Sequence, residues 1–414
     1  MHNFFAQARF PAPEFENYTL PEMNLETVVS DPTYLRVAVL AVFLLVAGLG
    51  FYRLRSRKLM LAISVAGLAV FGYYFTACPC PVGMFQNIAE STALGTPIPL
   101  SVLLLFAIPL ATALFFGRLF CAGACPLGAV QELLHWKTLQ VARPLDRVLR
   151  MLPIAMFLVF TVMAANGMGL IACYYDPYLP LFLLSFTSCC AGGTMPLTAI
   201  TITLLLLGLI VSRPFCRYVC PYGVLLRFFA MFAVRKPQIT ASSCINCKLC
   251  EQGCPNGAII PPETPISPDV QKHGARRLST LVALTPFALL LGGMLGYVAA
   301  PIVSAHHPDV QLLRMLNANE QTLEVEAFES SGTTMTELEQ NVAHAHNGIL
   351  LGLCICGIIF AACVMAELIA ESRRRKEDDT YTIDGSLCFC CGRCYQSCPL
   401  ETRGKLSGGS LSHG

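Results

Sequence analysis

Seven long apolar stretches constrain the fold of this chain more than any other feature of its sequence. Each comes close to or exceeds the roughly 17 helical residues that cross a hydrocarbon layer of about 30 Å. Only 13% of the residues are charged, whereas about a quarter are charged in an ordinary soluble domain. We therefore expect an all-α integral membrane protein with about seven transmembrane helices, near residues 36–52, 59–77, 99–116, 152–171, 196–212, 279–300 and 348–367.

Lysine and arginine gather on one side of these expected helices. Cytoplasmic loops retain positive charge because its translocation is disfavoured. This predicts a multi-pass protein of the bacterial cytoplasmic (inner) membrane, with the N-terminus outside and the C-terminus inside. Residues 1–35, which lack a signal-peptide core, would form an extracytoplasmic arm. The segments 53–58, 117–151, 212–278 and 368–414 hold 4, 5, 9 and 7 Lys plus Arg, which is 25 of the 28 in the chain.

Two cysteine motifs have the spacing C-x2-C-x2-C-x3-C-P of bacterial ferredoxins. In two-cluster ferredoxins, the fourth cysteine of one motif ligates the cluster that the other motif holds. The motifs lie 134 residues apart (388 minus 254), with two expected membrane helices between them that return the chain to the cytoplasmic side. Segments 241–275 and 371–414 therefore predict a cytoplasmic module with two 4Fe-4S clusters, and a flexible tail follows the second motif. The alternative is that these cysteines bind zinc. The ligands would be Cys244, Cys247, Cys250, Cys254, Cys388, Cys391, Cys394 and Cys398, and Cys390 would be a spare thiol.

A different motif, F-C-x3-C-P-x-G, occurs at Cys121 and Cys125 and again 95 residues later at Cys216 and Cys220. Residues i and i+4 share one face of a helix, so each hairpin offers two thiolates to the other. Four thiolates would complete a third 4Fe-4S cluster at the membrane surface. Two buried pairs of reduced thiols are the alternative. Positive charge close to this site comes from Arg118, Arg213 and Arg217. These residues would raise the reduction potential of a cluster, or they would only anchor the chain on the cytoplasmic side.

The same 95-residue offset relates residues 72–135 to 167–230, which predicts an internal repeat of two hairpins inside a membrane domain of residues 36–240. Each repeat carries cysteines at the outer face as well, namely Cys78, Cys80, Cys173, Cys189 and Cys190. A metal centre and disulfides are both open for these thiols, because the outer compartment is oxidising. Cys354, Cys356 and Cys363 lie inside the last expected helix and are interpreted as packing residues.

The remaining part, residues 276–370, should form two further transmembrane helices joined by the outer loop 301–347. Histidines bracket this loop and could ligate haem, accept quinol protons or simply be solvated; they are His306, His307, His344 and His346. Between them, six glutamates read as an acidic helical hairpin that would face water or dock a cationic cytochrome. The chain contains no nucleotide-binding fingerprint and nothing that predicts a nucleic acid partner.

Together, the paired C-x3-C-P motifs and the two ferredoxin motifs resemble the membrane polyferredoxins of the NapH and NosR type. The resemblance covers roughly residues 60–260 and 385–400. It implies a membrane-bound iron-sulfur electron-transfer subunit of a respiratory oxidoreductase, of the quinol dehydrogenase type, with the motif cysteines as cluster ligands. Membrane lipid, a quinone and a periplasmic cytochrome or other redox subunit would be its partners.

This sequence departs from that pattern in three respects. It lacks the outer flavin-binding domain of NosR-like members, its second ferredoxin motif follows two extra membrane helices, and it carries the outer-face cysteines. A related group of the CcoG or RdxA type serves in the assembly of a haem-copper oxidase. An assembly factor for a metalloenzyme is therefore the alternative function.

Overall fold

The fold was examined in a computed structural model of the chain. The outer-face cysteines Cys78, Cys80, Cys173, Cys189 and Cys190 and the N-terminal residues 1–31 lie outside the described residues, so the expectations for them remain predictions. The structure describes residues 32–75, 81–136, 141–169, 171, 179–182, 194–235, 237, 244–245, 247–261, 268–320, 322–373 and 381–399.

The described residues are almost entirely helical, as the apolar stretches predict. Short strands occur only at β1 (Ile259–Ile260) and β2 (Thr382–Ile383), which pair antiparallel with Ile259 opposite Ile383. The helices are α2 (Pro32–Gly48), η1 (Leu49–Arg53), α3 (Arg57–Gly67), η2 (Leu68–Tyr74), α4 (Pro81–Leu94), α5 (Leu100–Phe116), α6 (Leu119–Gly123), α7 (Pro126–Leu134), α8 (Arg143–Leu149), α9 (Leu152–Ala165), α11 (Leu179–Phe182), α12 (Thr194–Ile210), α13 (Pro214–Tyr218), α14 (Tyr222–Met231), α15 (Leu249–Gly253), α16 (Pro268–Ser304), α17 (Pro308–Asn317), α18 (Leu323–Ser330), α19 (Met335–Arg373) and α20 (Arg393–Ser397).

Five helical segments are long and apolar enough to cross a membrane, which confirms a multi-pass membrane protein. Two of the seven expected spans fall instead on the shorter apolar helices α5 and α12, which have 17 residues each. Helices of this length reach across a hydrocarbon core only at the lower limit. The five long segments are Tyr34–Arg53, Arg57–Tyr74, Pro144–Ala165, Arg277–Ser304 and Met335–Ala370.

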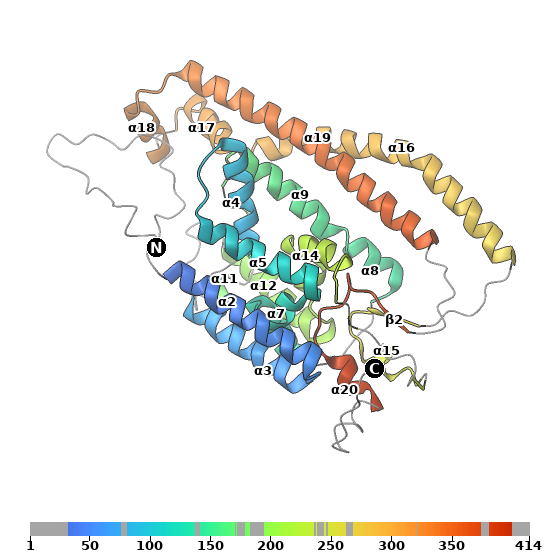
Figure 1. The fold of residues 1–414 in the computed structure, drawn as a ribbon. Coiled ribbons are helices and arrows are strands. Elements are labelled where there is room, and N and C mark those ends of the chain that lie inside the picture. The colour runs from blue at the N-terminus through green and yellow to red at the C-terminus, as the bar shows by residue number, and fades with distance from the viewer. Residues whose placement is uncertain are drawn as a thin grey trace.

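The last two of these segments form a long helical pair, α16 and α19, along one side of the molecule (Figure 1). Glycines allow the two backbones to touch, since a Cβ on Gly296 would overlap the carbonyl oxygen of Leu353 and one on Gly292 would overlap that of Gly357. Small residues at such a crossing permit close van der Waals packing between membrane helices. At the far end of the pair lie α17 and α18, which fill the expected acidic outer segment.

The histidines near α17 have structural contacts in this fold. His307 is buried; its Nε2 lies 3.0 Å from the carbonyl oxygen of Asn166, and its Nδ1 accepts a hydrogen bond from the Asp309 amide at the start of α17. Since one ring nitrogen donates and the other accepts, neither is free for a haem iron. The Nδ1 of His346 lies 3.1 Å from Ser304 Oγ, so these contacts tie the outer segment to the membrane helices.

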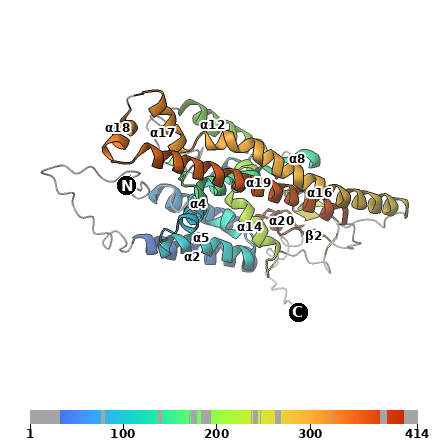
Figure 2. The same ribbon diagram turned by 90° about the horizontal axis from the view of Figure 1, so that it is seen from above.

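The main hydrophobic core lies among the N-terminal helices rather than around the long pair. It contains Leu40, Leu44 and Phe71 from the first two long segments, and it also contains Cys121 and Cys216. Phe389, from the other end of the sequence, is buried in the same core. The fold thus places the C-terminal cysteine motif against the C-x3-C-P motifs. Figure 1 shows α15 and α20 at the opposite end of the molecule from α17 and α18, and Figure 2 also shows α20 well apart from them.

Candidate metal centres

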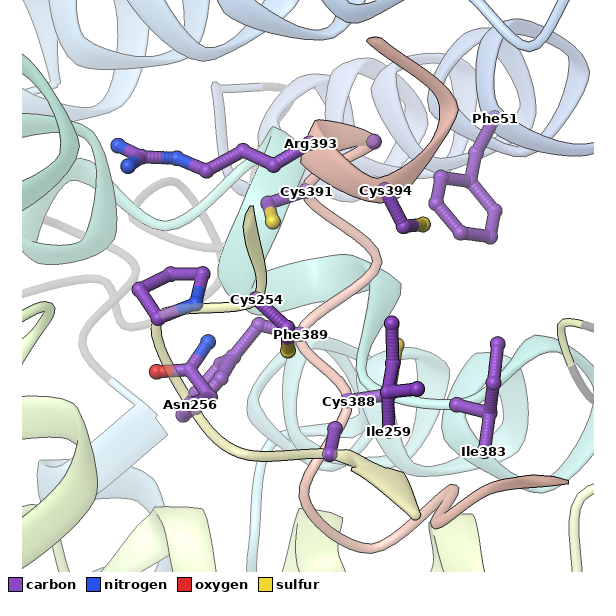
Figure 3. Close-up of a pocket in the computed structure, with 13 residues that line it drawn as sticks. Phe51, Cys254, Asn256, Ile259, Ile383, Cys388, Phe389, Cys391, Arg393 and Cys394 are labelled. Carbon is purple, nitrogen blue, oxygen red and sulfur yellow. The ribbon is translucent and has the colours of Figure 1, made fainter. Parts of the chain in front are cut away.

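Four cysteines from both ferredoxin motifs line one pocket, here called the module pocket (Figure 3). Cys388, Cys391 and Cys394 are the first three cysteines of the second motif, and Cys254 is the fourth of the first motif. Phe51, Ile259 and Ile383 are among the apolar side chains that complete its wall. This is the combination that cross-ligation between two ferredoxin motifs requires.

The two motifs have matching backbone conformations. The residue after the second cysteine of each motif is left-handed, with φ of 61° at Lys248 and 75° at Gly392. A five-residue helix follows in both cases and carries the third cysteine. Gly253 of the first helix touches Ser397 of the second so closely that a Cβ on Gly253 would overlap the Ser397 hydroxyl. The two helices, α15 and α20, therefore pack together at equivalent positions. Each contacting residue directly precedes the fourth cysteine of its own motif.

The other four ferredoxin cysteines do not line the module pocket. Cys247 is exposed and Cys244, Cys250 and Cys398 are half-buried. Desolvation raises the phenol pKa of Tyr381, next to β2, and negative charge on Glu251 and on the nearby Cys250, Cys244 and Cys247 raises it further. Cys398 follows α20 directly, and α20 packs on α15. The first three cysteines of the first motif thus lie near one another, away from the module pocket, and the ferredoxin rule makes Cys398 their expected fourth ligand.

The four C-x3-C-P cysteines also come together, and we call them the membrane cysteine group. Cys121 and Cys216 are buried in the main core, and Cys125 and Cys220 pack against it. The expectation that each pair shares one helix face is wrong. Cys121 lies in α6, whereas Cys125 is the N-cap of α7, where Pro126 begins a new helix. This break turns the second cysteine of the hairpin back toward the first.

Tyr222, two residues after Cys220, links the second hairpin to the middle of α5. Its hydroxyl donates to the Phe106 carbonyl oxygen at 2.9 Å. Beyond α14, the Val234 amide donates to the Leu114 carbonyl oxygen near the C-terminal end of α5. The segment that follows Cys220 therefore runs beside the second half of α5.

Gln131 on α7 contacts the membrane cysteine group through its side-chain amide. Its Nε2 donates to Cys216 Sγ at 3.3 Å, and its Oε1 accepts from the Phe215 backbone amide at 3.0 Å. A donor on a ligating sulfur stabilises the more negative state of a cluster. Gln131 was not a candidate from the sequence, because a buried glutamine on an apolar helix has no local signature.

The second ferredoxin motif is inserted into the membrane domain. Cys390 is buried against α3 and α6, and its Sγ lies 3.6 Å from the Phe116 carbonyl oxygen. The preceding Phe389 is 2% exposed, with the guanidinium carbon of Arg118 at 3.9 Å and that of Arg213 at 5.4 Å from its ring centre. The thiol that the sequence leaves spare is therefore an anchoring side chain, and two of the three basic residues noted in the sequence, Arg118 and Arg213, lie at this contact.

A buried carboxylate joins the membrane domain to the C-terminal motif. The side chain of Glu132, on α7, is 3% exposed and is paired with Arg57, Arg213 and Arg393. Burial by itself would raise the pKa of Glu132, but the positive charges of Arg213, Arg393 and Arg57 outweigh it and lower the pKa to about 2. Arg393 belongs to the second ferredoxin motif, so this ion cluster holds the motif in place.

A similar arrangement serves the first ferredoxin motif. Asp146 on α8 accepts a hydrogen bond from the Tyr218 hydroxyl at 2.6 Å, and it pairs with Arg217 at 2.6 Å and with Arg150. Arg217 also donates to the Pro255 carbonyl oxygen at 3.5 Å. Each ferredoxin motif therefore rests on an arginine whose charge is compensated by a carboxylate from α7 or α8.

These cysteines are spread more widely than the ligands of a single ion. Among the described residues, no three His, Cys, Asp or Glu side chains are grouped closely enough to hold one metal ion. In a 4Fe-4S cluster each thiolate binds a different iron, so its four sulfurs stand further apart than the ligands of one zinc ion. The thiol-lined, largely apolar module pocket fits a cluster better than it fits zinc.

Comparisons with protein families agree with these motifs. A family described as "4Fe-4S binding domain" matches residues 98–144 and again 193–240, and each match contains one C-x3-C-P motif. A second family with the same description matches residues 237–260, which contain the first ferredoxin motif. The chain therefore carries 4Fe-4S binding domains on a framework of apolar helices.

Three curated proteins are similar over short stretches. The uncharacterized protein MJ0749 of Methanocaldococcus jannaschii is 49% identical over 51 residues, 12% of this chain and 21% of the relative. The "Putative electron transport protein YccM" of Escherichia coli is 38% identical over 64 residues, 16% of this chain and 18% of the relative. The uncharacterized protein MJ0750 of M. jannaschii is 41% identical over 66 residues, 15% of this chain and 26% of the relative. The matches thus span only 18–26% of the relatives' length, and no solved structure matches.

Proposed function

We propose that the chain is a membrane polyferredoxin that binds 4Fe-4S clusters and conducts electrons between a cytoplasmic module and a site inside the membrane. One observation carries this proposal. Cys254 shares the module pocket with three cysteines of the second motif, and Phe389 of that same motif lies in one core with Cys121 and Cys216. The ferredoxin module and the membrane cysteine group are therefore in direct contact.

The contacts support three cluster sites in a row. The site farthest from the membrane cysteine group would be held by Cys244, Cys247, Cys250 and Cys398. The module pocket would hold the second cluster with Cys254, Cys388, Cys391 and Cys394. The membrane cysteine group, Cys121, Cys125, Cys216 and Cys220, would hold the third. A bound 4Fe-4S cluster supplies one-electron chemistry, while the protein places the ligands, excludes water and sets the local charge.

The charge around the membrane cysteine group favours a cluster over neutral thiols. Arg118 is 5% exposed; its Nη1 donates to the Ser386 carbonyl oxygen and its Nε has no partner among the described residues. A buried cation without a counter-charge costs several kcal/mol. Four thiolates around an oxidised 4Fe-4S core carry a net charge of about −2, which would compensate this arginine. Four neutral thiols would not.

The arrangement also supports the finer features expected from the sequence. Seven membrane crossings, including α5 and α12, would place the ferredoxin module inside and α17 with α18 outside, in keeping with their positions at opposite ends of the molecule (Figure 1). The two matches to one family begin 95 residues apart (193 minus 98), the offset of the expected internal repeat. α12, α13 and α14 follow one another much as α5, α6 and α7 do.

In this arrangement the electron donor would be quinol or a cytoplasmic protein, and the acceptor would be a cytochrome or another redox subunit of a respiratory chain in the bacterial inner membrane. A further metal centre at the outer-face cysteines would extend the route across the membrane.

Purification under mild conditions tests whether the protein is an electron-transfer subunit or an assembly factor. An electron-transfer subunit copurifies with its redox partner in fixed proportion, whereas an assembly factor is substoichiometric, and its deletion leaves an oxidase poor in metal.

Iron analysis of the anaerobically purified protein tests the number of clusters. We expect about twelve irons and about twelve acid-labile sulfides per chain, and interacting signals in electron paramagnetic resonance (EPR) of the reduced sample. The change Cys216→Ser should remove about four irons. The matched control is Cys363→Ser on α19, a half-buried thiol outside all three sites, and it should remove none. About eight irons in the unaltered protein would refute the third cluster and favour the assembly role.

A further inference from the structure

We infer that Phe389, held between the guanidinium groups of Arg118 and Arg213, is the contact through which electrons pass between the module pocket and the membrane cysteine group. The inference rests on the proposed function and names the residues that carry the transfer between two of its sites. Phe389 and Cys390 come from the C-x-C-C part of the second ferredoxin motif, where the ferredoxin spacing itself asks for neither residue.

The two arginines form a pair related by the 95-residue offset (213 minus 118), and each precedes the first cysteine of its C-x3-C-P motif by three residues. Each reaches across to the other hairpin. Arg213 Nη1 lies 3.6 Å from the Cβ position of Gly128, and Arg118 Nη2 lies 3.4 Å from that of Gly223. Arg213 also donates to the Cys121 carbonyl oxygen at 2.6 Å. Both cations therefore lie between the hairpins, beside the membrane cysteine group.

Phe389 enters between these two cations from the module side. It lines the module pocket together with Cys388 and Cys391 (Figure 3), and it packs in the core that contains Cys121 and Cys216. The ring is thus part of the module pocket wall and of the core that contains Cys121 and Cys216. The guanidinium groups are drawn to the ring face by a cation–π interaction, which fixes the ring in this position.

Ordinary core packing explains a buried phenylalanine, but it does not explain this setting. Two buried cations, only one of which is paired with a carboxylate, converge on the ring of a residue placed inside a cluster-binding motif. Residues that keep positive charge close to both thiolate sites stabilise an electron on either side. The apolar ring between them excludes water from the path.

The step itself needs little from the protein. With clusters held by the cysteines of the module pocket and by the membrane cysteine group, one electron would pass from the first site, which would be oxidised, to the second, which would be reduced. No bond forms or breaks and no proton has to move. Phe389 provides the packed contact, and Arg118 and Arg213 are positioning residues that hold the ring and tune the charge.

The test compares Phe389→Leu with Phe328→Leu in the full-length holoprotein. Phe328 is also buried, but it packs with Leu312 and Val325 and does not line the module pocket. After rapid mixing with a soluble reductant that reduces the exposed module first, freeze-quench EPR follows reduction of the membrane site. We expect Phe389→Leu to slow this step roughly tenfold, equivalent to about 1.4 kcal/mol in barrier, with unchanged iron content. Phe328→Leu should leave the rate within about twofold.

Two further variants separate the role of the ring from that of the charge. Phe389→Tyr keeps the ring and should restore most of the rate. Arg118→Gln should lower the potential of the membrane site, shifting electron distribution between the two sites about tenfold, or about 59 mV for one electron. Equal rates in Phe389→Leu and Phe328→Leu, with about twelve irons retained, would overturn this inference alone. About eight irons in the unaltered protein would instead overturn the proposed function beneath it.

Discussion

The ion cluster at Glu132 should hold the second ferredoxin motif on the membrane domain. We predict that Glu132→Gln, a change that keeps the size of the side chain and removes its charge, loosens residues 381–399. Arg213 is 1% exposed and would keep its buried positive charge without a counter-ion. Arg393 would lose the contact that ties α20 to α7.

The magnitude follows from the pKa of the carboxyl group. Its fall from the usual 4.5 to about 2 corresponds to about 3 kcal/mol of preferential stabilisation of the charged form. Breaking a buried ion pair by removing one partner costs about 3–5 kcal/mol, which agrees. Because the pKa in the folded protein lies below the ordinary value, this contribution is complete at pH 7 and is lost as the pH falls from about 4.5 to about 2.

Hydrogen–deuterium exchange with mass spectrometry measures this effect on the intact holoprotein at pH 7. A loss of about 3 kcal/mol should accelerate exchange in residues 381–399 roughly a hundredfold. The control is Glu367→Gln, which removes a carboxylate paired with Arg227 while both side chains are 25–29% exposed. Pairs of that kind contribute about 1 kcal/mol or less, so its effect should stay below tenfold and near α14 and α19. An unchanged rate in residues 381–399 of Glu132→Gln, with iron retained, would refute the reasoning.

Two other predictions concern the packing of α16 against α19 and the start of α17. Gly296→Ala should separate α16 from α19, because a Cβ there would overlap the Leu353 carbonyl. The expected result is a lower thermal unfolding midpoint in detergent. The control Gly208→Ala, whose Cβ position has open space, should leave the midpoint unchanged or raise it. His307→Ala removes both the N-cap of α17 and the contact with Asn166 and should cost about 1 kcal/mol. Faster amide exchange confined to α17 and α18 would support that role, and loss of a haem-like absorbance would contradict it.

Much of the site could be predicted because cluster ligation imposes a spacing on the sequence. The sharing of Cys254 with the second motif and the meeting of the two C-x3-C-P motifs both follow from that rule. The detailed shape of the hairpin did not follow, since an i, i+4 spacing suggests one continuous helix. Pro126 instead begins a second helix directly after Cys125, and a proline at that position stabilises a helix start.

The residues that connect the parts could not be predicted in the same way. Glu132 looks like any acid on a helix, and its importance comes from Arg57 and Arg393, which are 75 and 261 residues away in the sequence. Phe389 and Cys390 likewise gain their roles from contacts with helices more than 200 residues earlier. Local patterns carry no information on such contacts, because side-chain pairing between distant segments depends on the whole fold.

The order in which the chain is synthesised gives the split ferredoxin module a further consequence. The two motifs are separated by α16, α17, α18 and α19, so the ribosome completes the long helical pair before the second motif exists. Until then, in the proposed arrangement, Cys244, Cys247 and Cys250 would lack their fourth ligand, and Cys254 would have no pocket to join. A chain that stalls or fails to insert its last helices would then acquire neither ferredoxin cluster in full, and its hairpins would lack the ring of Phe389. Iron loading would therefore report that membrane insertion has been completed.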